Sequence, residues 1–188
     1  CSSADGATTA GETAEGGTVT VVASTNVYGN LAASVGGDHV EVTSLIDSAA
    51  KDPHSYAATA RDRLAVQNAD LVIENGGGYD SFMEELREGS DANVIIAAEY
   101  AHDYPDAVIE EEPEEHAEHE GDDHDHIEGF NEHVWFDVHT ITHVVEQIAA
   151  DLTEIDPEGA ADYEANAAEL IADLGAIETE QDALHEKV

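Results

Sequence analysis

The sequence predicts an α/β fold, in which a parallel sheet is covered by helices on both faces and is followed by one long α-helix. Two observations predict it. Short runs rich in Val, Ile and Leu alternate with segments of helical periodicity, and this alternation is typical of parallel sheets with helical crossovers. After Pro157, a helical pattern of apolar residues continues to the end of the chain without a strong breaker.

Four strands are expected, because four short runs are rich in β-branched residues and are bounded by polar or glycine-rich segments. The predicted strands cover residues 18–24, 40–46, 69–75 and 93–98. The third ends at three consecutive glycines, Gly76 to Gly78, which we interpret as a flexible turn.

Helices are expected between and after these strands. The predicted helices cover residues 26–35, 59–68 with Thr59 as the cap, 79–87, and a segment from about Thr140 whose apolar face is Ile141, Val144, Val145, Ile148 and Leu152. In the third, Phe82, Met83 and Leu86 can face the core. The last helix should begin at Pro157 after the cap Asp156. Its stripe is Tyr163, Ala167, Leu170, Leu174, Ile177 and Leu184.

The charge is extreme: 44 Asp and Glu stand against 5 Lys and Arg, a net charge of −39 in 188 residues. Nucleic acids and anionic membranes need a basic surface, so we do not expect them as partners. The acids are interleaved with apolar runs along the whole chain, which disfavours general disorder. Adaptation to high salt explains this spread best, because molar salt screens self-repulsion. A purely metal-buffering acidic protein is the alternative.

The single cysteine, Cys1, excludes an internal disulfide and a cysteine-based metal site. A cysteine at the first position, followed by a Gly/Thr/Ala/Glu segment over residues 1–17, predicts a lipid-anchored lipoprotein with a flexible linker. A sequence boundary that falls on cysteine by chance is the alternative. No apolar run approaches the roughly 20 residues that span a bilayer.

Histidines indicate metal handling, since neutral imidazole is a preferred ligand of zinc-like cations. His54 lies in the run Asp52-Pro53-His54-Ser55-Tyr56, a few residues after the second predicted strand. His133 lies in Asn131-Glu132-His133-Val134-Trp135-Phe136-Asp137, where the apolar residues should enter the core. An acidic tract between them, residues 110–128, contains His116, His119, His124 and His126 but no Lys or Arg.

Each candidate has an ordinary alternative. His54 can be a surface turn residue, His133 a buried structural histidine, and the tract a solvated spacer rather than a weak metal-capturing loop. Asp52 can orient the imidazole of His54, and Asp137 can either support His133 or cap the following helix, which we favour. His139 and His143 share a helix face, but the sequence lacks the Glu of an H-E-x-x-H motif, so we expect a helix surface.

These two histidine motifs, in this order around a histidine-rich loop, resemble the metal-binding lipoproteins of ABC importers for zinc and manganese. Residues 68–76 are similar to that family's strand after the first ligand segment, and residues 156–166 to the start of its long bridging helix. The similarity covers residues 18–188. It implies an N-terminal α/β lobe over residues 18–155 and a bridging helix over residues 156–188, with the second lobe outside this chain.

The resemblance implies that His54 and His133 are direct ligands of Zn²⁺, with Mn²⁺ less favoured, in a monomer that captures metal at the extracellular face and delivers it to a membrane permease. It implies no enzymatic reaction. Ala57 to Ala60 and Val138 depart from the family's proline-containing pattern, and the family's other two ligands are missing. The alternative function is a surface metal-scavenging or adhesion protein without an importer. A zinc hydrolase would need a third ligand and a general base, which no local motif provides.

Overall fold

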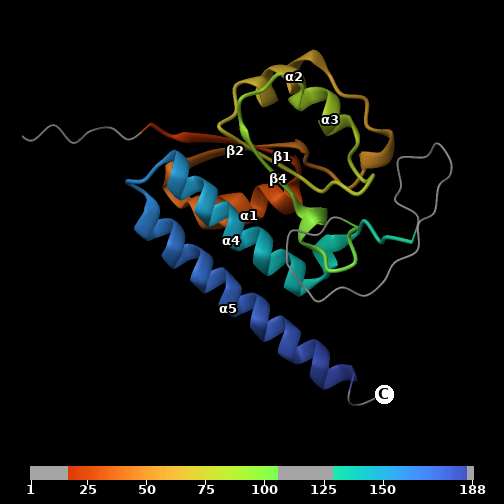
Figure 1. Ribbon diagram of the computed structural model, residues 1–188, viewed down its shortest axis with the longest axis vertical. Coiled ribbons are helices and arrows are strands. Elements are labelled where there is room, and N and C mark those ends of the chain that lie inside the picture. Colours follow the sequence, from red (N-terminus) through yellow and green to blue (C-terminus); the bar gives the residue numbers. More distant parts are fainter. Residues whose placement is uncertain (1–16, 106–128, 186–188) are drawn as a thin grey trace, which may run out of the picture.

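The computed structural model describes residues 17–105 and 129–185. Its centre is a four-stranded sheet, and every pair of neighbouring strands is parallel (Figure 1). The strands are β1 (Val19–Thr25), β2 (Val40–Ile46), β3 (Leu71–Glu74) and β4 (Asn93–Ile96), in the order β2-β1-β3-β4. The predicted strands therefore exist and pair as the α/β expectation requires.

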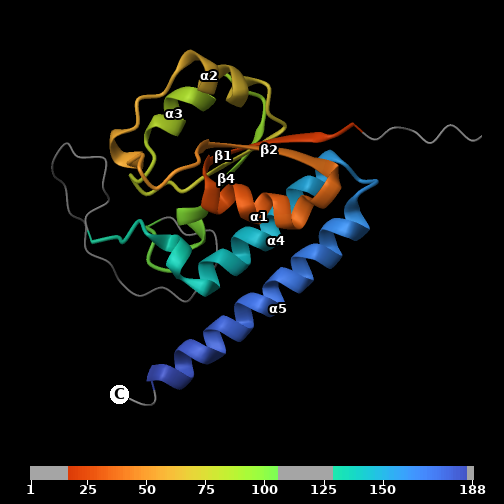
Figure 2. The ribbon, with the colours of Figure 1, turned by 180° about the vertical axis from the view of Figure 1, so that it is seen from behind.

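Helices cover both faces of the sheet. The helices are α1 (Asn26–Gly36), α2 (Ala60–Gln67), α3 (Phe82–Arg87), α4 (Val138–Ile155) and α5 (Ala160–His185), and the short 3-10 turns are η1 (Gly37–His39), η2 (Pro53–Ser55), η3 (Ala97–Tyr100) and η4 (Val134–Phe136). One face carries α2 and α3, the other carries α1 and α4, and α5 packs outside α1 and α4 (Figures 1 and 2).

The central strands β1 and β3 are buried on both faces because they are apolar on both. Val21 and Ile73 belong to the core under α1 and α4, whereas Val22 and Val72 belong to the smaller core under α2 and α3. Near-continuous Val, Ile and Leu runs are what a doubly covered parallel strand requires. Each such side chain contributes about 1.5–3 kcal/mol when it is fully buried.

Two predicted caps are confirmed. Thr59 accepts a hydrogen bond from the Asp62 backbone while Asp62 accepts one from the Thr59 backbone, so a reciprocal capping box starts α2. Asp137 accepts a hydrogen bond from the Thr140 backbone and starts α4. The five apolar residues predicted to form the inner face of α4 are all buried.

The predicted start of the last helix was wrong. Asp156 ends α4, residues 157–159 form a turn, and α5 begins at Ala160. The carboxylate of Asp156 accepts a hydrogen bond from the Tyr163 hydroxyl at 2.7 Å instead of capping the backbone of α5. The turn closes through the Gly159 N–H, which donates to the Asp156 carbonyl.

The predicted stripe of α5 is buried only in its first half. Tyr163 and Ala167 lie in the core, and Leu170 and Leu174 pack against it. Ile177 and Leu184 are 49% and 62% exposed. The helix therefore leaves the domain, and its second half extends beyond the amino-terminal end of α4 (Figure 1).

Several predictions fall on residues that the structure does not describe. Cys1 and most of the predicted linker are among them, and so is the stretch that holds His116, His119, His124 and His126. Within the described residues, no helix combines the length and the apolar character needed to cross a bilayer.

Candidate metal centre

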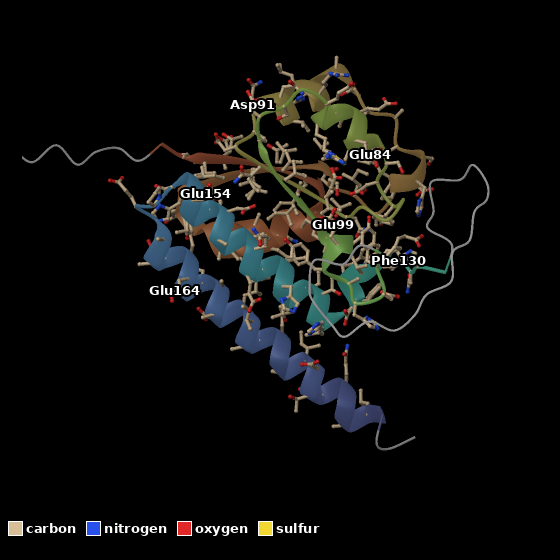
Figure 3. The ribbon with its side chains drawn as sticks, viewed as in Figure 1. Glu84, Asp91, Glu99, Phe130, Glu154 and Glu164 are labelled. Carbon is tan, nitrogen blue, oxygen red and sulfur yellow. The ribbon has the colours of Figure 1, made fainter. Side chains whose placement is uncertain are left out.

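The candidate site lies at the carboxyl edge of the sheet. β1 connects outward to β2 through α1 on one face, and β3 connects outward to β4 through α3 on the other. Ligands of open α/β sheets bind where neighbouring strands diverge in this way. In Figure 3, Glu99 and Phe130 mark this end of the domain, and Glu154 and Glu164 mark the opposite end.

The structure brings His54 and His133 to the same place, on either side of Glu132. The Nε2 atom of His54 lies 3.8 Å from Oε1 of Glu132. The Nδ1 atom of His133 lies 3.9 Å from the same oxygen. His54 and His133 are 79 positions apart in the sequence. Their imidazole nitrogens nevertheless lie around one carboxylate.

Tyr79 is the aromatic centre of this cluster. Its ring meets those of His54 and His133 edge to face, with centroids 5.0 Å and 5.8 Å away, and its centroid is 4.7 Å from that of Trp135. An open pocket of about 440 Å³ lies beside them. The pocket is lined by Thr25, Asn26, Val27, Ile46, Ser48, Ala49, Lys51, Asp52, Pro53, Tyr79 and Trp135.

Asp52 positions His54 through the backbone. One oxygen of Asp52 accepts a hydrogen bond from the His54 N–H at 3.1 Å, and the other accepts one from the Ser55 hydroxyl at 3.4 Å. Pro53 occupies the first position of the short helix η2, where its fixed φ fits the turn. We expected Asp52 to orient the imidazole of His54. In the contacts described, Asp52 instead accepts a hydrogen bond from the His54 backbone.

Asn131 orients the ring of His133. Its Oδ1 atom lies 2.9 Å from His133 Nδ1 and also accepts the His133 backbone N–H at 3.2 Å. An amide oxygen can only accept, so Nδ1 is the donor and Nε2 carries the lone pair. This tautomer leaves Nε2 as the metal-binding nitrogen.

A buried amide fastens the His133 segment to the sheet. Asn75 follows β3, and its Nδ2 donates to the carbonyl of Glu132 at 2.8 Å and to that of Gly76 at 2.9 Å. The hydroxyl of Tyr28 donates to Asn75 Oδ1. Burial raises the pKa of Tyr28 well above its ordinary value, and the nearby Asp80 charge adds to the shift, so the hydroxyl keeps its proton.

The turn between β3 and α3 is held by a buried carboxylate. Asp80 accepts the backbone N–H groups of Asn75 and Gly76, both at 2.8 Å. Burial raises the pKa of Asp80, and these hydrogen bonds oppose the shift. Gly76, Gly77 and Gly78 all have positive φ, and a Cβ on Gly77 would lie 2.7 Å from the Phe130 ring. The triple glycine is therefore a tightly packed turn rather than the merely flexible one predicted.

A second buried carboxyl lies at the end of β3. Glu74 is 3% exposed, and its Oε2 lies 3.3 Å from Nε of Arg87. Burial raises the pKa of Glu74 to about 8, with Asp80 adding to the shift and Arg87 opposing it.

The apolar segment after His133 enters the core only in part. Val134 is buried and Trp135 is half-buried, but Phe136 is 74% exposed. The expectation that all three residues enter the core was therefore wrong for Phe136. His133 itself lies exposed at the surface, which disagrees with its interpretation as a buried structural histidine.

Sequence reasoning missed four residues of this site: Tyr79, Asn75, Asn131 and Glu132. Asn75 and Tyr79 flank the triple glycine directly after a buried strand, which is the signal that could have found them. Among the residues described, no three His, Cys, Asp or Glu side chains converge as a ready cation site. The two histidines thus form an open, incomplete ligand set.

Comparison with known proteins finds similarity to metal-binding proteins. The family model described as "ZnuA: Zinc-uptake complex component A periplasmic" matches residues 21–188. "Manganese-binding lipoprotein MntA" of Halalkalibacterium halodurans is 29% identical over 174 residues, which are 92% of this chain and 52% of the relative. "Zinc-binding protein AdcA" of Streptococcus pyogenes serotype M3 is 25% identical over 150 residues, or 74% of this chain and 28% of the relative.

Solved structures share the fold. A Mn-bound periplasmic metal-binding protein from Candidatus Liberibacter asiaticus is 27% identical with a TM-score of 0.62, over 82% of this chain and 52% of that one. The periplasmic zinc-binding protein TroA from Treponema pallidum has a TM-score of 0.69 at 22% identity, over 87% of this chain and 54% of that one. The chain spans about half the length or less of the relatives it matches.

Proposed function

Because the chain belongs to the ZnuA family of zinc-uptake complex components, we propose that it is a metal-capturing lobe of a substrate-binding protein that serves an ABC importer. Two of the relatives are named for binding manganese and zinc. The observation that carries the proposal is the meeting of His54 and His133 around Glu132 at the carboxyl edge of the sheet. In this function the metal is cargo and no covalent chemistry occurs.

The donor set supports zinc over manganese. Two neutral imidazoles suit Zn²⁺, whereas Mn²⁺ prefers sites richer in oxygen ligands. Zinc usually takes four donors, so further ligands must join His54 and His133 for tight binding. Capture then requires that another part of the protein approach this edge.

Partners and location follow from the same proposal. We infer that the protein works outside the cell membrane, is held there by a lipid on Cys1, and hands its cargo to a permease; one relative is named a manganese ABC transporter substrate-binding lipoprotein. The net charge of −39 supports a high-salt environment.

The test is Zn²⁺ titration against a competing chelator in molar KCl, where self-repulsion is screened. His54→Ala and His133→Ala should each weaken the tightest site by at least about 100-fold, since each removes a direct ligand. His102→Ala is the matched control, because His102 is exposed and outside the cluster. A deletion of residues 110–128 should leave the tightest site intact.

The opposite pattern would overturn the proposal. If the deletion removes the tightest site and both histidine variants keep it, metal is captured by the acidic tract and not between His54 and His133. The chain would then be a scavenger rather than an importer's receptor. Repeating the titration with Mn²⁺ tests the metal preference, and tighter binding of Mn²⁺ than of Zn²⁺ would contradict it.

A further inference from the structure

The outer side of α4 carries a second pair of histidines. His139 and His143 lie four residues apart, and their ring centroids are 4.7 Å apart with the planes nearly perpendicular, at 88°. The buried residues of α4, such as Val144 and Ile148, lie on the opposite side of the helix. The two imidazoles therefore lie side by side away from the core, with the His143 side chain 29% exposed.

Glu146 fixes the orientation of one ring. Its Oε2 atom lies 3.1 Å from Nδ1 of His143, one turn away along the helix. A carboxylate accepts here, so Nδ1 carries the proton and Nε2 of His143 carries the lone pair. Metal-ligating histidines are held in the same way, by a carboxylate on the nitrogen that does not bind the metal.

The local charge also suits a cation. No Lys or Arg occurs within α4, and Glu146, Asp151 and Glu154 all lie on it. In the described contacts, no Lys or Arg side chain forms a salt bridge with the residues of this face. An i,i+4 pair of imidazoles on a helix can chelate one ion, because side chains with this spacing are neighbours.

We propose that His139 and His143 form a second, weaker binding site for a divalent transition metal, with Glu146 as the positioning residue. The ion would be one that favours imidazole, namely Zn²⁺, Ni²⁺ or Cu²⁺ rather than Mn²⁺. Two protein ligands leave the other coordination positions of the ion to water, so the ion should exchange rapidly with solution. This site lies outside the set formed by His54, His133 and Glu132.

The site lies near the main cluster along the chain. His139 follows His133 by six residues, so the two lie within about 20 Å of each other whatever the path between them. An ion held loosely here is already concentrated beside the carboxyl edge of the sheet. The site can therefore collect metal for the cluster at His54 and His133 without altering it.

The experiment is a Zn²⁺ titration of the full chain followed by NMR of its histidine rings, with resonances assigned from single variants. The His139 and His143 rings should shift together with one apparent affinity. His139→Ala should abolish the shift of His143, and His143→Ala that of His139. Glu146→Ala should weaken this affinity by about 10-fold or more, and Glu146→Gln should restore part of it.

Two controls separate this site from the others. His102→Ala should change nothing, and a His54→Ala/His133→Ala double variant should keep the coupled shift of His139 and His143. Loss of the coupled shift in the double variant would show that the two sites are not independent. Rings of His139 and His143 that do not move at saturating Zn²⁺, or that titrate independently of each other, would overturn the proposal.

Discussion

The two edges of the sheet both carry histidines, but they hold them differently. At the amino edge, His39 lies between two carboxylates, with Nε2 2.9 Å from Asp162 and Nδ1 3.6 Å from Asp156. At the carboxyl edge, His54 and His133 face a shared carboxylate at 3.8 Å and 3.9 Å beside an open pocket. Both nitrogens of His39 are thus engaged, whereas the tautomer of His133 leaves one nitrogen for a ligand.

The edges also differ in what lies beneath the histidines. Of the buried polar side chains in the described residues, Ser24, Thr25, Glu74, Asn75 and Asp80 all lie at or just beyond the carboxyl ends of β1 and β3. Buried polar groups cost stability unless their partners are well placed. The carboxyl edge therefore supports its site with buried polar groups, whose burial costs stability and which hold the site rigid. At the amino edge, the histidine makes a surface contact that joins α5 to the domain.

Asn75→Ala should give the largest loss of stability. It leaves the buried Tyr28 hydroxyl and the Glu132 carbonyl without their shared partner, so we expect a loss of about 2–3 kcal/mol in the free energy of unfolding. Denaturant unfolding in molar KCl measures it. A loss under about 0.5 kcal/mol would show that this edge is not the rigid support described.

Asn131→Ala should leave stability nearly unchanged and weaken Zn²⁺ binding by about 10- to 100-fold, because the His133 ring loses the acceptor that fixes its tautomer. Asn131→Asp is the matched variant, since it keeps an acceptor at the same place. Chelator competition measures both. Equal affinities for the alanine variant and the parent would show that Asn131 does not orient the ligand.

The buried Glu74 should make stability depend on pH. Its folded pKa of about 8 lies above the ordinary value of 4.5, so between these pH values the folded state binds more protons than the unfolded one. The stabilisation from this group is therefore fully present below about pH 4.5 and is lost as the pH rises towards 8. Because one proton is involved, the free energy of unfolding falls by at most about 1.4 kcal/mol per pH unit. Glu74→Gln should flatten the decline, as seen by unfolding at several pH values.

Tyr163→Phe tests the amino edge. It removes the hydrogen bond of 2.7 Å to Asp156 but keeps the buried ring, so we expect a loss of about 1 kcal/mol. Zn²⁺ affinity should not change, because the residue lies at the far end of the sheet. A coupled fall in metal affinity would show that the two edges are not separate.

His39→Ala should have the smallest effect. Its side chain is 35% exposed and that of Asp162 is 69% exposed, so solvent screens the pair and we expect a loss under about 1 kcal/mol. Metal affinity should again match the parent. A loss comparable to that of Asn75→Ala would erase the proposed contrast between the two edges.

Most of the fold could be predicted from local patterns. The strands came from β-branched runs and the α4 face from its helical spacing, and both are local signals that tertiary packing then used. The prediction of where α5 begins failed because the Asp156 side chain accepts a hydrogen bond from Tyr163. This contact spans seven residues, and no capping rule describes it. The prediction of one continuous stripe failed at Ile177 and Leu184, which are exposed. Periodicity shows which helix face is apolar, but it does not show whether another part of this chain covers that face.

The site was predictable only in its histidines. Their motifs pointed to His54 and His133, and their segments meet at the carboxyl edge of the sheet, where the Asn75 amide binds the Glu132 carbonyl. Glu132 and Asn131 are ordinary polar residues until the chain places one between the two imidazoles and the other on a ring nitrogen. Asn75 acts through the backbone of a segment 57 residues away, which no spacing rule can reveal.

The half-buried α5 has a mechanical consequence. Its 26 residues make a rod about 39 Å long. The rod is clamped near its start, where Asn166 donates to the Val35 carbonyl at 3.0 Å and His39 contacts Asp162. A tilt of roughly 5° at that clamp would carry the far tip through about 3 Å, given the helical rise per residue. The helix thus turns a small angular change at the amino edge into a tip displacement that exceeds the length of a zinc–nitrogen bond, about 2 Å.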